Sequence, residues 1–248
     1  MFGFKRRPTT SLAPNAAANV HAADLAALSY IPRRHGSVGA RRPDLTLPAG
    51  FIPPCLPMTA PCVPSGGLWL HEIKHDGLRI IARNDGRKVR LYGRSGKDLT
   101  ARYPLIAETM ARLPPCSIDG EAIACDDNGV ASFELLRGGL RDHCVFLYAF
   151  DLIELAGEDR RRDALAHRKV DLIRLLANAG PGVLPNEWVD GDTCDGASVF
   201  KHAGSLGFKG IVSKRKDSRY ISGRSPYWLK MTNQGRGSTA GAGEVVGR

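Results

Sequence analysis

The chain has 248 residues, of which 43% are hydrophobic, so it is long and apolar enough for one domain with a packed core. Its formal net charge of +10 favours a polyanionic partner such as nucleic acid, although a merely basic soluble protein would carry the same charge. No apolar run approaches the roughly 18 residues of a membrane span, and the N-terminus lacks the apolar core of a secretory signal. A membrane protein and a secreted protein are therefore not expected.

Cysteine usage favours a reducing compartment. The six cysteines form no CxxC pair, and no Cys/His cluster has the spacing of a zinc site. Scattered, reduced thiols are typical of a cytoplasmic protein, which is the location we expect. The basic, Ala-rich N-terminus leaves an organelle transit peptide as an alternative.

The two ends of the chain differ in composition from its centre. Residues 1–50 are basic and have little helical periodicity, so a disordered tail is predicted there. Residues 233–248 are rich in Gly and Ser and are predicted to be a second, flexible tail. The folded domain is expected over 51–232.

Between these tails, short strands alternate with helices. Strands are predicted at 68–74, 78–85, 88–94, 117–123, 144–155, 209–215 and 227–231. Helices are predicted at 100–115, 162–179 and 196–208, with a short one beginning near Phe133. Thr100 is expected to cap the first helix, and Pro104 to lie in its first turn. Strands that outnumber helices and are joined by hairpins predict an α+β domain with antiparallel sheets.

The stretch EIKHDGLR (72–79) places charged residues at the end of an apolar strand. Lys74 comes at the strand end, a tight turn follows, and Arg79 returns toward the same place. A lysine beside a buried sheet can act as a nucleophile if it is desolvated or lies near other cations. Taken alone, a lysine at this position favours an ordinary solvated strand end over a nucleophile.

Further charged residues interrupt or adjoin strands that otherwise look buried. They occur in YGRSGKD (92–98), IDGEAI (118–123), YAFDL (148–152), KGIVSK (209–214) and RSPYWLK (224–230). Unpaired charges at such places would be costly, so these residues must pair with one another or with a ligand.

The ordered series KxDGxR, GRSGKD, DGE, YAFDL, GIVSK and WLK resembles the nucleotidyltransferase domain of ATP-dependent DNA ligases. The resemblance covers Leu68 to Met231 and is nearest to bacterial ligases associated with break repair. It implies an ATP-grasp-like, antiparallel-sheet adenylation domain. It also implies nick sealing on double-stranded DNA in repair or recombination, with ATP and Mg²⁺.

The same resemblance implies a role for each motif residue. Lys74 would form the lysyl-AMP, and Mg²⁺ would neutralise the phosphate oxygens during transfer. Glu121 would bind either the ribose or the metal. The other implied nucleotide contacts are Arg79 and Arg94 to the sugar and phosphates, Lys214 and Lys230 to the α-phosphate, Phe150 stacked on adenine, and Glu72 near the nucleotide. Phe150, read without the motifs, is equally compatible with a core residue.

The sequence departs from the family pattern at two positions. Lys209 stands where the family has a glutamate associated with metal binding, which is expected to weaken Mg²⁺ binding. Thr232 replaces the second lysine of the last motif, so one phosphate contact is expected to be lost.

Family ligases also carry an OB-fold after this domain, and we expect the 248 residues to lack it. A partner supplying that fold, or an end-bridging function, is therefore expected. Two alternatives stay open: a catalytically impaired descendant that binds nucleotide or DNA, and an RNA ligase or capping guanylyltransferase.

Overall fold

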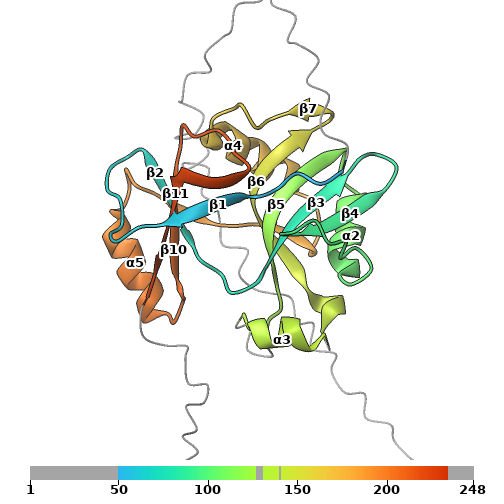
Figure 1. The fold of residues 1–248 in the computed structure, drawn as a ribbon, viewed down its shortest axis with the longest axis horizontal. Helices are drawn as coiled ribbons and strands as arrows, with labels where there is room; N and C mark the ends of the chain where they lie inside the picture. The colour runs from blue at the N-terminus through green and yellow to red at the C-terminus, as the bar shows by residue number, and fades with distance from the viewer. Residues whose placement is uncertain (1–49, 127–130, 140, 234–248) are drawn as a thin grey trace, which may run out of the picture.

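A computed structural model describes residues 50–126, 131–139 and 141–233 (Figure 1). The predicted tails at 1–50 and 233–248 therefore lie outside the described residues, apart from residues 50 and 233. No helix within the described ranges has the length and apolar character needed to cross a membrane.

The first sheet has five strands, which we call sheet A. In spatial order they are β1 (Cys55–Thr59), β11 (Gly223–Thr232), β10 (Gly210–Arg215), β2 (Trp69–Ile73) and β9 (Trp188–Asp190). Neighbouring strands are antiparallel except β1 and β11, which are parallel. Strand β2, which leads into Lys74, is thus interior, and interior strands are held on both sides.

The second sheet, sheet B, runs in the order β4 (Val89–Gly93), β3 (Leu78–Asn84), β5 (Cys116–Ile123), β6 (Phe146–Leu155) and β7 (Glu158–Asp159). A sixth strand, β8 (Val183–Pro185), pairs in parallel with β6. The two long strands β5 and β6 are almost entirely buried, although each carries two acidic residues among its apolar ones.

Four α-helices and one short 3-10 helix accompany the sheets in the described part of the chain. They are α2 (Pro104–Ala111), α3 (Phe133–Gly138), η1 (Asp142–Cys144), α4 (Leu165–Leu176) and α5 (Gly196–Ser205). Helix α5 packs on β10 of sheet A, whereas α2 packs on β3 and β4 and α4 on β6 of sheet B (Figure 1). Helix α4 also contacts sheet A. The prediction of an α+β domain with antiparallel sheets is confirmed, with two parallel pairs added.

The first helix begins later than the sequence indicates. Its first residue is Pro104, and Tyr103 takes the cap position without a side-chain hydrogen bond. The expected cap, Thr100, instead accepts a hydrogen bond from the backbone N–H of Leu91 and donates one to Asp98. The prediction was wrong because a residue before proline is pushed out of the helical region, so the helix cannot extend back through Tyr103.

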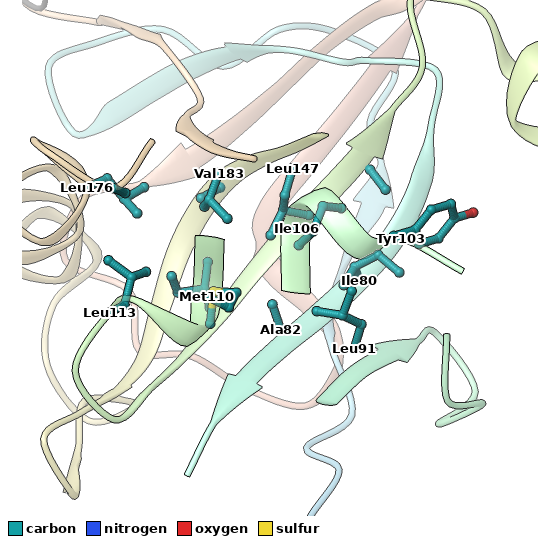
Figure 2. Packing of buried hydrophobic residues seen from close by; sticks show 14 of the residues in the cluster. Ile80, Ala82, Leu91, Tyr103, Ile106, Met110, Leu113, Leu147, Leu176 and Val183 are labelled. Atoms are coloured by element: carbon teal, nitrogen blue, oxygen red, sulfur yellow. The ribbon is translucent and has the colours of Figure 1, made fainter. Parts of the chain in front are cut away.

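Four apolar clusters of described residues hold the layers together, and the two largest bear on the site. The larger lies between sheet B and its helices, where α2 contributes Ile106 and Met110 and β3 contributes Ile80 (Figure 2). The smaller joins the two sheets, because Ile81 and Phe150 of sheet B pack with Trp228 of sheet A. The second cluster fixes how the sheets face each other, and the cavity described below lies beside it.

A fully buried ion pair ties α4 to the centre of sheet B. The guanidinium of Arg168 meets both carboxylate oxygens of Asp151 at 2.7 and 2.8 Å, and neither side chain is exposed. Arg168 also donates to the backbone carbonyl of Ser218 at 2.9 Å. Asp151, which ends the YAFDL motif, is therefore paired within the fold.

Removing one member of this pair should destabilise the domain strongly. Because Arg168→Met leaves Asp151 buried without its cation, we expect the free energy of unfolding to fall by about 3–5 kcal/mol. Urea denaturation followed by circular dichroism measures it. Arg174→Met, on the exposed side of the same helix, is the control and should change stability by less than about 1 kcal/mol. Equal losses in the two variants would contradict the assignment.

Candidate active site

A cavity of about 120 Å³ lies between the two sheets. Strand β2 and the turn after it contribute Glu72 and Lys74, while β10 contributes Lys214. Sheet B supplies the remaining predicted site residues of the lining, which are Arg79, Glu121 and Phe150. Six of the eight residues predicted from the sequence are thus brought to one place.

Lys74 is positioned by backbone contacts on both of its sides. Its backbone N–H donates to the carbonyl of Gly210 at 2.9 Å, which extends the β2–β10 ladder by one residue. The chain then crosses from sheet A to sheet B through His75, Asp76 and Gly77. A Cβ on Gly77 would lie 2.3 Å from the carbonyl oxygen of Ala122, so only glycine fits there. This close approach brings the turn against the strand that carries Glu121.

Glu72 is a buried carboxylate surrounded by donors. Its Oε1 forms an ion pair with Lys169 of α4 at 2.5 Å. Its Oε2 accepts from Lys214 at 2.7 Å and from the side-chain amide of Asn186 at 3.0 Å. Burial alone would raise the pKa of Glu72, but the two lysines outweigh it and hold that pKa below its ordinary value. Glu72 is therefore a fixed negative charge.

Asn186 extends this contact toward His75. The Nε2–H of His75 donates to Asn186 Oδ1 at 2.8 Å, a direction set by the amide, whose nitrogen donates to Glu72. The His75 ring also stacks on Tyr148 with centroids 4.5 Å apart. Burial lowers the pKa of His75, which keeps the ring neutral and fixed next to Lys74.

Lys214 lies between its carboxylate and two aromatic rings. Its Nζ is 4.0 Å from the Phe150 ring centroid and 4.1 Å from that of Trp228. Burial lowers the pKa of Lys214 from 10.5 to about 8, and Glu72 only partly offsets it. The ammonium therefore stays largely charged at neutral pH, at the wall of a cavity suited to an anion.

Arg79 is held by Asp119 rather than left free in the cavity. Its guanidinium meets the two Asp119 oxygens at 2.5 and 2.6 Å and donates to the Cys55 carbonyl at 2.8 Å. Burial opposes the charge, yet Asp119 raises the pKa of Arg79 above its ordinary value. The hydroxyl of Tyr220 also donates to Asp119, at 2.6 Å. The guanidinium lies 4.5 Å from the Phe150 ring centroid, so Arg79 and Lys214 both contact that ring.

The cavity lining contains two carboxylates, and among the described residues the side chain of Glu121, unlike that of Glu72, forms no ion pair. Burial raises the pKa of Glu121, and the neighbouring cations Arg79 and Lys74 only partly offset this. Within the described ranges no three His, Cys, Asp or Glu side chains gather closely enough to hold a metal by themselves. Mg²⁺ in phosphoryl-transfer sites is commonly held by one or two carboxylates with substrate phosphates and waters, and Glu121 fits that donor set.

Two predicted residues lie outside the cavity lining. Arg94 is exposed in the turn after β4. Lys230 is on β11 opposite Val212, and strand alternation places it on the same face as Trp228.

The two departures from the family pattern lie at the ends of strands β10 and β11. Lys209, next to the Gly210 carbonyl that binds Lys74, forms an ion pair with Asp76 at 2.6 Å. Thr232 is exposed at the end of β11, opposite Gly210.

Sequence reasoning missed the partners that hold the motif residues, including Lys169, Asn186 and Tyr220. Lys169 left a signal, because Leu165, Leu172 and Leu176 share its helical stripe at spacings of three and four. A lysine in an otherwise apolar stripe indicates a buried partner. Asn186 and Tyr220 left no comparable signal.

The family model for the ATP dependent DNA ligase domain matches residues 64–232. The chain belongs to the ATP-dependent DNA ligase domain family. The match includes sheet B, all of sheet A except β1, and every residue of the cavity lining except Pro57.

Relatives include DNA repair proteins of several bacteria. The multifunctional non-homologous end joining DNA repair protein LigD of Mycobacterium tuberculosis is 40% identical over 169 residues, which are 65% of this chain and 21% of LigD. A DNA ligase of Natronomonas pharaonis is 35% identical over 64% of this chain and 31% of its own length. The chain thus spans about a fifth to a third of these relatives.

Solved structures give the same fold. A mycobacterial DNA ligase D complexed with ATP and MES superposes with a TM-score of 0.63 at 34% identity, covering 73% of this chain and 60% of that one. A Chlorella virus DNA ligase-adenylate superposes with a TM-score of 0.57 at 20% identity, covering 74% of this chain and 69% of that one. The latter likeness concerns the fold alone.

The lowered pKa of Lys214 predicts a pH dependence of stability. Between pH 8 and 10.5 the unfolded chain keeps a proton on this lysine that the folded protein has released. The contribution of Lys214 to stability therefore rises with pH through this window and is lost as pH falls toward 8. Urea denaturation of the wild type and of Lys214→Met is carried out at several pH values from about 7.5 to 9.5. The free energy of unfolding of the wild type should rise relative to that of the variant as the pH increases. A constant difference would refute the lowered pKa.

Proposed function

We propose that this cavity is the adenylation site of a DNA ligase and that Lys74 is its nucleophile. The observation that carries the proposal is the position of Lys74, fixed by the Gly210 carbonyl at the edge of a cavity lined by Lys214 and Arg79. Cationic side chains in a cavity lining attract the negatively charged phosphates of a nucleoside triphosphate. Membership of the ligase domain family supports ATP as the nucleotide.

In the first step, the Lys74 amine attacks the α-phosphorus of ATP. A phosphorus–nitrogen bond forms, the bond to the bridging oxygen of pyrophosphate breaks, and pyrophosphate leaves with the electron pair. The amine proton goes to solvent. Lys214 neutralises charge on the phosphate, and Lys230 lies on the neighbouring strand to do the same. Phe150 offers an apolar surface for the base, and Arg94 reaches the nucleotide only if its turn folds inward.

Among the described residues of the cavity lining, Glu121 is the carboxylate best suited to bind a divalent metal. We assign Glu121 as the carboxylate for Mg²⁺, which when bound would neutralise phosphate oxygens during transfer. Glu121 could instead bind the ribose. Glu72 is unsuited to the metal because its two oxygens are already engaged by cations.

In the later steps, the AMP passes to the 5′-phosphate of a nick in double-stranded DNA, and a 3′-hydroxyl then displaces it. LigD relatives named for non-homologous end joining support a place in DNA repair or recombination. Because the chain matches only part of those relatives, we assign DNA clamping and end bridging to a further module or partner, such as an OB-fold. The free thiols of all six cysteines fit a cytoplasmic location.

A catalytically impaired, nucleotide-binding protein is the second candidate function. The Lys209–Asp76 ion pair favours it, because it places an ammonium beside the turn that carries Lys74. That cation would repel a divalent metal approaching Asp76.

Lys74 should be the residue that carries the AMP label. Incubation with α-labelled ATP and Mg²⁺ should leave label on the denatured wild type and none on Lys74→Ala, because the amine is the attacking group. Lys97→Ala, an exposed lysine in the turn after β4, is the control and should keep the label. Labelled GTP in parallel tests the capping alternative.

An unlabelled wild type, together with label on Lys209→Glu plus Thr232→Lys, would reject the active enzyme and favour the impaired one. Label retained on Lys74→Ala would place the nucleophile elsewhere.

The charge at position 209 should determine the Mg²⁺ concentration that lysyl-AMP formation requires. Lys209→Glu puts a second carboxylate beside Asp76, so we expect half-maximal lysyl-AMP formation at about tenfold lower Mg²⁺. Lys209→Met removes the ammonium without adding a carboxylate, so its Mg²⁺ requirement should lie between those of the wild type and Lys209→Glu. A magnesium titration of the labelling rate measures all three proteins. The same Mg²⁺ requirement in all of them would show that Lys209 has no influence on the metal.

A further inference from the structure

The buried lysine of α4, Lys169, is absent from the cavity lining yet contacts the carboxylate that lines it. Its side chain is fully buried, and its Nζ lies 2.5 Å from Glu72 Oε1. It also lies 4.6 Å from the ring centroid of Trp188, on the β9 side of sheet A. No anionic ligand in the cavity can reach this ammonium without displacing Glu72.

Lys214 is in the opposite situation. It contacts the other oxygen of the same carboxylate at 2.7 Å, and it lines the cavity. A phosphate entering the cavity would therefore compete with Glu72 for Lys214. Whether Lys214 can be released depends on what remains around Glu72 afterwards, because a buried carboxylate without a cation is strongly unfavourable.

We propose that Lys169 is a positioning residue that keeps Glu72 neutralised, so that Lys214 can exchange its carboxylate for a nucleotide phosphate. This inference rests on the proposed function and assigns it a residue outside the cavity. With Lys169 on Oε1 and Asn186 on Oε2, Glu72 keeps a cation and a hydrogen bond after Lys214 has moved. Without Lys169, Lys214 would be the last cation beside Glu72 and would stay there.

Charge counting supports this role. One carboxylate faces two ammonium groups, so the cluster carries one surplus positive charge inside the fold. Such a surplus is unfavourable in isolation and becomes favourable once an anion joins it. A phosphate beside Lys214 supplies that anion, whereas a cluster of Glu72 and Lys214 alone would already be balanced.

The test is a thermodynamic cycle on nucleotide binding. The probe is α,β-methylene-ATP, whose carbon bridge prevents pyrophosphate release, titrated by calorimetry in the presence of Mg²⁺. We expect Lys169→Met to weaken its affinity by about tenfold to a hundredfold. In the Glu72→Gln background, where no carboxylate can retain Lys214, the same change should weaken affinity by less than about threefold.

Lys216→Met is the matched control. Lys216 is a buried lysine that pairs with Asp190 and Asp192, away from the cavity, and its loss should change affinity by less than about threefold. If Lys169→Met does not fold, Lys169→Gln replaces it, because the amide still donates to Glu72 but carries no charge.

Equal loss of affinity in the two backgrounds would overturn the proposal, because Lys169 would then act independently of Glu72. Unchanged affinity in the Lys169 variants, or no binding by the wild type, would overturn it as well. Failure of the proposed function gives a different result. A wild type that binds the analogue but forms no lysyl-AMP with ATP is not an adenylating enzyme, and its binding cycle still decides the role of Lys169.

Discussion

The burial of the Glu72 carboxylate is the constraint on which the cavity depends. A carboxylate removed from water needs cations and donors around it, and here they come from α4, β10 and the segment between β8 and β9. Three distant parts of the chain therefore converge on one side chain. Because the lysines exceed the carboxylate in number, the resulting site is positively charged and prepared for an anion.

Most of the fold could be predicted because its main strands are long apolar runs and its turns carry Gly or Pro. Strands β1, β8 and β9 could not, since they are three to five residues long, and β1 and β8 each contain a proline. Their pairing is decided by the neighbouring strand rather than by their own sequence. The start of α2 was misplaced because Pro104 outweighed the capping potential of Thr100.

The cavity was predictable to the extent that its residues lie in ordered motifs. The motifs indicated Lys74, Glu121 and Lys214, but not what each contacts. Arg79 lines the cavity and also holds Asp119, a pairing across neighbouring strands that only the register of β3 and β5 reveals. Lys209 was expected to disturb a metal site, and its contact with Asp76 depends on how the strand start meets the turn.

The chain passes directly between sheet A and sheet B in the short turn of His75, Asp76 and Gly77 and again between β8 and β9, so a hinge between the sheets would lie at these two crossings. Lys74 and Lys214 both belong to sheet A and would move together as one body if the sheets separated. Glu121 and Phe150 would move with sheet B. The Arg79 bond to the Cys55 carbonyl and the Tyr220 bond to Asp119 span the gap and limit its opening. Motion at this hinge would thus alter the width of the cavity while leaving the distance between its two sheet A lysines unchanged.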